Sequence, residues 1–400
     1  MRILLVTSQY PPTPGGGGVY TRYLVDALCS VRKPNGDPKC EIRVLTASEE
    51  RPTRIRPAPN VEIHKGTFSR DGRVAYERTV GYGLKLCREF QPQVIHGQHF
   101  DGAYVAAQLR AAFPSARFYV TFHKSPTGRS LVGWEQRDPR VAAMLSFVRQ
   151  VDRFVVPCQI YRNELLGAGI KPRLVELIWP GINVTLVKDI AIGRKTIAVN
   201  LLEKMGLQLG KFERIVLCPA RLDPTKDIET LIRAAGVLKR HLGNSTRVAF
   251  LVAGRSKPQP DQERRYEEDL LAIARREGVL ADVFIGSFDI HDMYAVYKLC
   301  DACILPSVRE ALGLVLIEAM ALRVPVIVAN VDGVTDVAVP EVNSLAFSSR
   351  NHEELANCLE RILFDRDQKK RLVKAASRTI LERFSYKKMG SEHYDLYRGY

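Results

Sequence analysis

Short, continuous apolar runs alternate with longer amphipathic segments along this chain, and this alternation restricts its fold more than any other feature. In the first half the runs lie at residues 3–6, 43–45, 94–96, 118–121 and 153–156. A strand whose apolar residues are consecutive is buried on both faces, as in a parallel sheet covered by helices. The sequence therefore predicts β-α-β units and an α/β fold with a doubly wound parallel sheet.

The same pattern starts again near residue 214, which indicates a second domain. The second series of apolar runs lies at 214–218, 248–252, 283–285, 302–305 and 324–328. The stretch between the two series, residues 184–212, has no strong strand and carries isolated charges, so we expect a linker with a short helix there. We therefore predict two Rossmann-like domains, residues 1–195 and residues 196–384.

The last amphipathic segment, from about Leu372, contains two residues that interrupt a helix, Ser385 and Gly390. A break at these residues allows the chain to leave the second domain. We expect a helix at about 385–400 that packs on the first domain.

Composition excludes several classes of protein. With 46% hydrophobic and 26% charged residues, the chain falls among globular proteins and outside disordered or collagen-like ones. No window approaches the ~18 consecutive apolar residues of a membrane-spanning helix, and the first apolar run is too short for a secretory signal. The eight cysteines are scattered, and Cys300 and Cys303 have no second ligand pair nearby. We expect reduced thiols, no metal and a cytoplasmic protein.

The positive charge is concentrated in the first half of the chain. Residues 1–200 contain 29 Lys and Arg against 16 Asp and Glu, whereas residues 201–400 contain 30 against 28, out of a net charge of +15. This asymmetry predicts an acidic partner for the first half, either a phosphorylated small molecule or an anionic lipid surface, although it is also compatible with a role in solubility alone. No motif of a nucleic-acid-binding domain accompanies it, so we expect no nucleic acid.

A glycine run, Gly15 to Gly18, follows the first predicted strand. Glycines let the backbone approach a ligand closely, and the helix that follows offers unpaired amides to an anion. The run differs from the dinucleotide-binding pattern G-x-G-x-x-G, which argues against a nicotinamide oxidoreductase. By itself the run is equally compatible with a surface loop.

The motif over residues 306–321 carries the most chemistry. It predicts a strand end, a loop with Glu310, and a helix that begins near Gly313 and includes Glu318. Amides at the start of such a helix can hold a phosphate, and the two carboxylates can accept hydrogen bonds from hydroxyl groups. Carboxylates repel a phosphate unless cations are close, and Arg221 and Lys226 can supply that charge.

Glu310 and Glu318 reproduce the E-x7-E signature of the retaining GT-B glycosyltransferases of family 4, which this chain resembles over nearly its whole length. The other matching segments are the glycine run, residues 94–96, 121–123, 179–183, 221–226, 252–254 and 284–288. The resemblance implies a GT-B fold, in which two Rossmann-like domains face each other across a cleft. It also implies an acceptor-binding first domain and a donor-binding second domain.

Carried over by position, the resemblance implies roles for individual residues. His123 and Glu310 are the implied catalytic residues, with Glu310 on the transferred sugar, and Glu318 on the ribose of the nucleotide. The implied donor-binding residues are Gly15, Gly16, Gly17, Gly18, Arg221, Lys226, Gly254, Ile285, Ser287, Phe288, Gly313, Leu314, Val315 and Glu318.

The acceptor side is less well defined by the resemblance. We place His96, His99 and Lys124 there, although Lys124 stands where an Asp commonly follows the His of the family pattern. Asp332 and Asp336 also depart from that pattern, which often has Gly and Glu at these positions. The segments 123–125 and 224–231 faintly resemble the sucrose-phosphate synthases within the family.

The resemblance implies retaining transfer of a hexosyl group from a UDP- or GDP-linked sugar to a hydroxyl acceptor, in carbohydrate biosynthesis, without a metal or other cofactor. The D-x-D at Asp365 and Asp367 lies in a charged helical stretch and does not predict a metal site. Two alternatives remain at this point. They are a GT-B sugar-nucleotide epimerase or hydrolase, and a non-catalytic subunit that binds a nucleotide sugar.

The two loops predicted to contact the acceptor, residues 64–83 and 124–140, are rich in Lys and Arg. We therefore expect an acceptor that carries phosphate or carboxylate, or one presented at an anionic membrane to which the first half binds peripherally.

Overall fold

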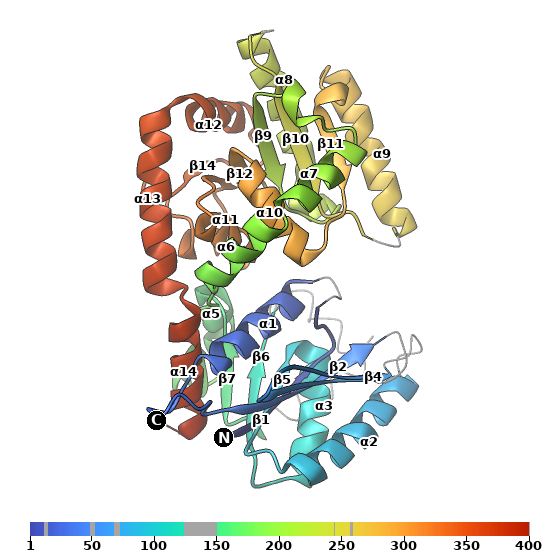
Figure 1. Cartoon of the computed structure of the whole chain (residues 1–400), viewed down its shortest axis with the longest axis vertical. Coiled ribbons are helices and arrows are strands. Elements are labelled where there is room, and N and C mark those ends of the chain that lie inside the picture. Colours follow the sequence, from blue (N-terminus) through green and yellow to red (C-terminus); the bar gives the residue numbers. More distant parts are fainter. Residues whose placement is uncertain are drawn as a thin grey trace. The chain divides into compact units, whose positions relative to one another are not determined.

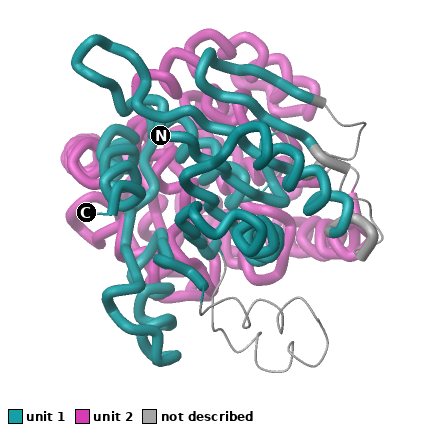
Figure 2. The backbone as a smooth tube through the Cα atoms, turned by 90° about the horizontal axis from the view of Figure 1, so that it is seen from below, with its two compact units in different colours: residues 1–183, 384–400 teal, residues 184–383 magenta. Residues whose placement is uncertain are grey.

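A computed structural model describes residues 1–11, 15–48, 53–67, 73–123, 150–243, 245–256 and 259–399. The chain forms two compact units, coloured separately in Figure 2. The N-terminal unit comprises Met1–Asn183 and Phe384–Tyr400, and the C-terminal unit comprises Val184–Arg383. Each unit contains one sheet with helices on both of its faces, as Figure 1 shows. The predicted α/β fold is therefore confirmed for both units.

The sheet of the N-terminal unit has the strand order β3-β4-β2-β1-β5-β6-β7-β8. Its strands are β1 (Arg2–Thr7), β2 (Glu41–Ser48), β3 (Thr53–Ala58), β4 (Val61–Thr67), β5 (Val94–Gln98), β6 (Arg117–Thr121), β7 (Arg153–Val156) and β8 (Val175–Leu177). Only the pair of β3 and β4 is antiparallel among these strands. The apolar runs form the central strands. A strand that is covered on both faces of the sheet has no solvent-facing side, so its residues do not alternate between apolar and polar.

The helices of this unit are α1 (Gly16–Cys29), α2 (Arg73–Phe90), α3 (His99–Ala112), α5 (Gln159–Gly167) and α14 (Tyr386–Arg398). Helix α3 packs against β1, β5 and β6, while α1 packs against α14. No helix in the described part of the chain is long and apolar enough to cross a membrane.

The sheet of the C-terminal unit has the order β11-β10-β9-β12-β13-β14 and is parallel throughout. Its strands are β9 (Arg214–Cys218), β10 (Val248–Ala253), β11 (Val283–Gly286), β12 (Ala302–Leu305), β13 (Val326–Ala329) and β14 (Leu345–Phe347). Its helices are α6 (Val184–Gly193), α7 (Lys195–Lys204), α8 (Ile228–Leu242), α9 (Asp261–Arg276), α10 (Ile290–Leu299), α11 (Leu314–Ala321), α12 (His352–Phe364) and α13 (Arg366–Arg383). Every residue of β10 is buried.

The boundary between the units lies after Asn183, not after residue 195 as the sequence suggested. The segment that we expected to be a linker forms α6 and α7, and both helices pack against α10 of the C-terminal unit. Arg194, between these two helices, also donates to Asp292 at the start of α10, with 2.5 Å between Nε and Oδ1. Apolar packing and this ion pair assign the segment to the C-terminal unit.

Gly390 does not interrupt a helix, contrary to our expectation, because it lies inside α14. A Cβ atom at this position would lie 2.1 Å from the backbone oxygen of Ala27 in α1. The glycine therefore allows two helix backbones to touch, and this close contact joins the C-terminal helix to the start of the chain.

We expect Gly390→Ala to destabilise the N-terminal unit by about 1–3 kcal/mol, since the new methyl group overlaps Ala27. Gly81→Ala is the matched control, because Gly81 also lies inside a helix, but a Cβ atom there would have no neighbour within 4 Å. This control should be neutral or stabilising by up to about 1 kcal/mol. Thermal unfolding of both variants measures the difference, and equal melting temperatures would contradict the packing role.

Candidate functional site

The C-terminal sheet has a topological switch point between β9 and β12. The chain continues from β9 to β10 and β11 on one side, and then returns to β12, β13 and β14 on the other. In open parallel sheets, ligands bind at the carboxyl ends of the strands next to such a point. The loops that follow β9 and β12 meet here, since Val308 donates its backbone N–H to the oxygen of Thr225 at 3.1 Å.

An ion pair between Lys226 and Glu310 lies at this point. Lys226 ends the short 3-10 helix Pro224–Lys226 after β9, and Glu310 lies in the loop after β12. Lys226 Nζ donates to Glu310 Oε2 at 2.7 Å, and the two side chains are 18% and 19% exposed. The turn is held by Asp223, which accepts hydrogen bonds from the backbone and hydroxyl of Thr225 at 2.9 and 2.6 Å.

Arg221 is the second cation at the end of β9, and its side chain is 69% exposed. The end of β10 packs directly behind it, because a Cβ atom on Gly254 would lie 2.1 Å from the backbone oxygen of Ala220. Gly254 also donates to the oxygen of Gly286 at 2.9 Å, which links the ends of β10 and β11. Ile285 lies in β11, and Ser287 and Phe288 follow that strand directly. The predicted donor-binding residues of these strands therefore share one edge of the sheet.

Helix α11 begins on the same edge. Its N-cap is Gly313, which adopts φ 78° and offers no side-chain cap, so the first turn, with Leu314 and Val315, presents backbone amides. Glu318 lies inside the helix and is 8% exposed. Tyr297 donates its hydroxyl to Glu318 Oε2 at 3.2 Å. Burial, followed by the nearby Glu318 carboxylate, raises the pKa of Tyr297 well above its ordinary value, so the hydroxyl stays protonated as a donor.

The loop after β13 supports Glu310 from behind. Gly333, at φ 87°, packs so closely that a Cβ atom would lie 2.2 Å from the oxygen of Ala311 and 2.7 Å from that of Glu310. The Asp332-Gly333 pair, which departs from the family pattern, thus keeps the glycine that this contact requires.

In the N-terminal unit, the glycine loop and His123 lie together at the carboxyl edge of the sheet. Gly15 to Gly18 start α1 directly after β1, and His123 follows β6. A Cβ atom on Gly17 would lie 3.2 Å from His123 Cδ2, and the ring of Tyr20 lies 4.6 Å from the imidazole centroid. Burial, with a smaller effect of His99, lowers the pKa of His123 to about 3, which keeps its ring neutral.

Sequence reasoning missed one residue of this group, Gln98. Its Oε1 lies 2.9 Å from His123 Nε2, and its side chain is completely buried at the end of β5. The signal available in the sequence was its position, since it ends a strand next to the one that carries His123.

Of the three residues placed on the acceptor side, His96 is instead a core residue. It is fully buried, with Nδ1 2.5 Å from the Tyr397 hydroxyl and Nε2 2.8 Å from Thr121 Oγ1. It therefore joins β5 and β6 to α14. His99 does lie near His123, with ring centroids 6.5 Å apart. Lys124 lies outside the described residues.

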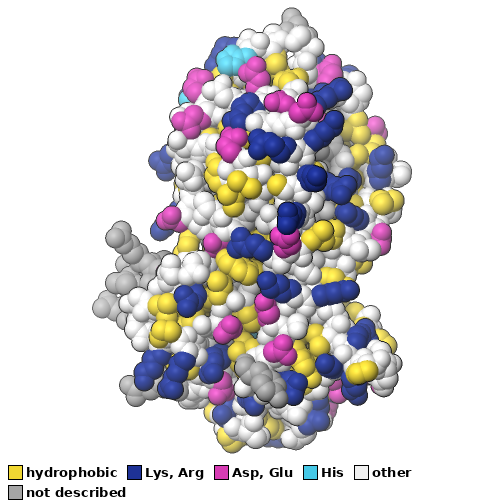
Figure 3. All heavy atoms as spheres, turned by 90° about the vertical axis from the view of Figure 1, so that its left-hand side faces the viewer, with side chains coloured by type: hydrophobic (Ala, Val, Ile, Leu, Met, Phe, Trp, Pro, Cys, Tyr) yellow, Lys and Arg dark blue, Asp and Glu magenta, His cyan; other side chains and the backbone are white. Residues whose placement is uncertain are grey.

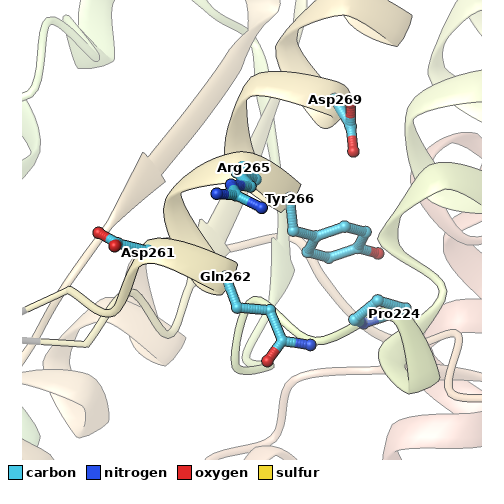
Figure 4. A pocket seen from close by; sticks show the side chains of 6 residues that line it. All are labelled: Pro224, Asp261, Gln262, Arg265, Tyr266 and Asp269. Carbon is cyan, nitrogen blue, oxygen red and sulfur yellow. The ribbon is translucent and has the colours of Figure 1, made fainter.

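A separate pocket of about 460 Å³ lies beside the turn that carries Lys226. Its lining residues are Pro224, Asp261, Gln262, Arg265, Tyr266 and Asp269. Figure 4 shows Gln262 and Tyr266 of α9 directed toward Pro224. Tyr266 donates to Glu229 at 2.6 Å. None of the predicted donor-binding residues lines this pocket.

Asp365, in the D-x-D of residues 365–367, caps the start of a helix. Asp365 precedes α13 and its Oδ1 accepts hydrogen bonds from the backbone of Asp367 and Gln368 at 3.1 and 2.9 Å. The described residues contain no group of three or more His, Cys, Asp or Glu side chains that could hold a metal ion. All eight cysteines are free thiols.

Two family models match the chain, one described as glycosyl transferases group 1 over residues 204–379 and one as glycosyltransferase family 4 over residues 14–186. The chain is therefore a glycosyltransferase that combines a family 4 domain with a group 1 domain. An uncharacterized glycosyltransferase of Methanocaldococcus jannaschii is 26% identical over 420 residues, with 100% of this chain and 98% of the relative covered. A glycogen synthase of Mycobacterium tuberculosis is 26% identical over 423 residues, with 99% and 94% covered.

Solved structures agree with this assignment at the level of the fold. The sucrose-phosphate synthase of Thermosynechococcus elongatus superposes with a TM-score of 0.76 at 24% identity, covering 100% of this chain and 98% of that one. Anabaena HepE in complex with UDP and glucose gives a TM-score of 0.75 at 18% identity, with both chains fully covered. This glycosyltransferase therefore has the predicted GT-B fold, and its relatives favour a transferase in carbohydrate biosynthesis over an epimerase or a binding subunit.

Buried histidines make the stability of this glycosyltransferase depend on pH. Burial lowers the pKa of His393 from 6.5 to about 4, and that of His96 well below its ordinary value. Below about pH 6.5 these histidines take up protons in the unfolded chain but stay neutral in the folded one. The free energy of unfolding therefore falls as the pH drops below about 6.5, by about 1.4 kcal/mol per pH unit for each such histidine.

We expect His393→Leu to reduce this slope by the contribution of one histidine, because it removes a group whose pKa burial lowers in the folded chain. The substitution leaves no partner of Nε2 unpaired, since Nε2 of His393 has none in the described structure. Urea unfolding of both proteins at about pH 7 and about pH 5 measures the slope. Stability that does not change over this interval in the unsubstituted protein would contradict the prediction.

Proposed function

We propose that this glycosyltransferase transfers a hexosyl group, with retention of configuration, from a nucleoside diphosphate sugar to a hydroxyl acceptor. The observation that carries the proposal is the Lys226–Glu310 pair, at 2.7 Å, beside the start of α11 at the switch point of the C-terminal sheet. A cation, a carboxylate and open helix amides at one place suit a ligand that combines phosphate with sugar hydroxyls.

The proposed donor contacts divide by charge. Lys226, Arg221 and the amides of Leu314 and Val315 bind the diphosphate, because they are positive groups at this edge. Glu310 accepts hydrogen bonds from the transferred sugar, and Glu318 accepts them from the ribose. UDP is the first nucleotide to test, since the solved complex of Anabaena HepE contains UDP and glucose.

The chemistry follows from the same charges. As the glycosidic bond breaks, negative charge develops on the leaving diphosphate, and positioned cations and helix amides stabilise it in the transition state. Glu310 is aimed at the sugar, where positive charge develops. His123, neutral at physiological pH, can accept or donate a hydrogen bond to the transferred sugar but does not add charge.

For the acceptor we propose a hydroxyl compound that carries a phosphate. The excess of Lys and Arg in residues 1–200 supports this, as do the names of relatives such as the D-inositol 3-phosphate glycosyltransferase of Saccharomonospora viridis. Figure 3 shows one face of the molecule, on which basic side chains are dispersed among acidic ones.

We expect Lys226→Ala to weaken UDP binding by roughly tenfold or more, because it removes a cation from the diphosphate and leaves Glu310 unpaired. Glu310→Gln should retain UDP affinity and lower turnover by about two orders of magnitude. Lys239→Ala is the control, since it breaks a comparable pair, with 2.8 Å between Lys239 Nζ and Asp282 Oδ2, elsewhere in the same unit. Calorimetric titration with UDP and product analysis with UDP-glucose measure both effects.

Unchanged UDP affinity in Lys226→Ala would show that the diphosphate is bound elsewhere. The acceptor is tested separately, by comparing the turnover of matched acceptors with and without a phosphate at low and high salt. A neutral acceptor that is preferred at both salt concentrations would reject the anionic acceptor.

A further inference from the structure

Gln98 and His123 form an isolated side-chain pair at the carboxyl edge of the N-terminal sheet. Gln98 is the last residue of β5, and His123 lies two residues beyond the end of β6, the neighbouring strand. Gln98 Oε1 lies 2.9 Å from His123 Nε2. Among the described residues, no protein atom forms a hydrogen bond with the other ring nitrogen of His123, Nδ1.

The pair determines which ring nitrogen carries the proton. An amide oxygen can only accept, so the nitrogen that faces it, Nε2, must be protonated. In a neutral imidazole the other nitrogen, Nδ1, is then a hydrogen-bond acceptor. The ring is held in this orientation by its neighbours, since Cδ2 faces Gly17 and the ring of Tyr20 packs against the imidazole.

Gln98 is a costly residue at this place if its only role is in stability. The side chain is completely buried, and its Nε2 has no partner in the described part of the chain. An unpaired buried amide group costs about 1–3 kcal/mol, so an apolar residue would serve the core at least as well. Residues that cost stability in this way occur at functional sites, where position matters more than stability.

The groups around the ring favour its neutral form. Tyr20 faces it from α1, His99 from the start of α3, and His96 lies in β5 behind it. None of these three carries a negative charge near pH 7 that could stabilise an imidazolium. Burial therefore dominates and holds the pKa of His123 at about 3. A neutral ring has two tautomers, and only a directed hydrogen bond selects one of them.

We propose that Gln98 is a positioning residue that holds His123 in the Nε2–H tautomer, so that Nδ1 accepts a hydrogen bond from a hydroxyl of the transferred sugar. This inference rests on the proposed transfer reaction. It adds to that reaction which group donates and which group accepts in the hydrogen bond between His123 and the sugar. It requires a hydroxyl donor on the sugar at that position, and it excludes a role for His123 as a proton donor through Nδ1.

Two substitutions of Gln98 separate the hydrogen bond from the shape of the side chain. Gln98→Leu removes the acceptor and the unpaired amide, whereas Gln98→Glu keeps an acceptor for Nε2–H. Thr46→Val is the control, because Thr46 is also fully buried in this sheet with an unpartnered hydroxyl but does not contact His123. The ring ¹⁵N shifts of His123, assigned by their loss in His123→Asn, report the tautomer directly.

We expect one Nε2–H tautomer in the unsubstituted enzyme, in Gln98→Glu and in Thr46→Val, and a mixture in Gln98→Leu. Gln98→Leu should also release UDP from UDP-glucose roughly tenfold more slowly or worse, with the affinity for UDP unchanged and the melting temperature not lowered. Gln98→Glu should keep part of this activity, and its carboxylate should raise the pKa of His123 by roughly 1–3 pH units. The pH profile of its activity measures that shift.

An unchanged tautomer in Gln98→Leu would overturn the proposal, and so would an altered tautomer without any loss of rate. If the unsubstituted enzyme releases no UDP from UDP-glucose, the proposed donor is wrong. The ring nitrogen shifts then still decide whether Gln98 sets the tautomer.

Discussion

Parallel strand pairing is the constraint on which the rest of this structure depends. A parallel pair requires each connection to return from the carboxyl end of one strand to the amino end of the next. The loops that follow parallel strands therefore meet at one edge of each sheet, however far apart they lie in the sequence. Lys226 and Glu310 are 84 positions apart, yet they form a hydrogen bond because they follow the adjacent strands β9 and β12.

Close backbone contacts convert this topology into defined geometry. Gly254 places the end of β10 against the backbone before Arg221, and Gly333 places the loop after β13 against Glu310. In both cases a methyl group would overlap a carbonyl oxygen. The charged side chains are therefore positioned by backbones that cannot move apart without breaking the packing, which is the preorganisation that an electrostatic site requires.

Much of the fold could be predicted from the sequence, and so could the residues that meet at the carboxyl edge of the C-terminal sheet. Continuous apolar runs indicated parallel strands, and the spacing of Glu310 and Glu318 indicated the family. The errors arose where a local signal competed with packing. A glycine such as Gly390 often interrupts a helix, but here it allows α14 to pack closely against α1. His96 ends an apolar run, as site residues often do, but it forms a hydrogen bond with Tyr397, 301 positions away.

The sequence by itself determined the two α/β units, the family and the identity of the charged groups, because these depend on local patterns of apolar and polar residues. Only the tertiary structure decided which of those groups touch. It paired Lys226 with Glu310, moved His96 into the core and brought Gln98 to His123. These outcomes depend on strand order and on close packing between distant segments, and neither quantity is encoded in the spacing of residues along the chain.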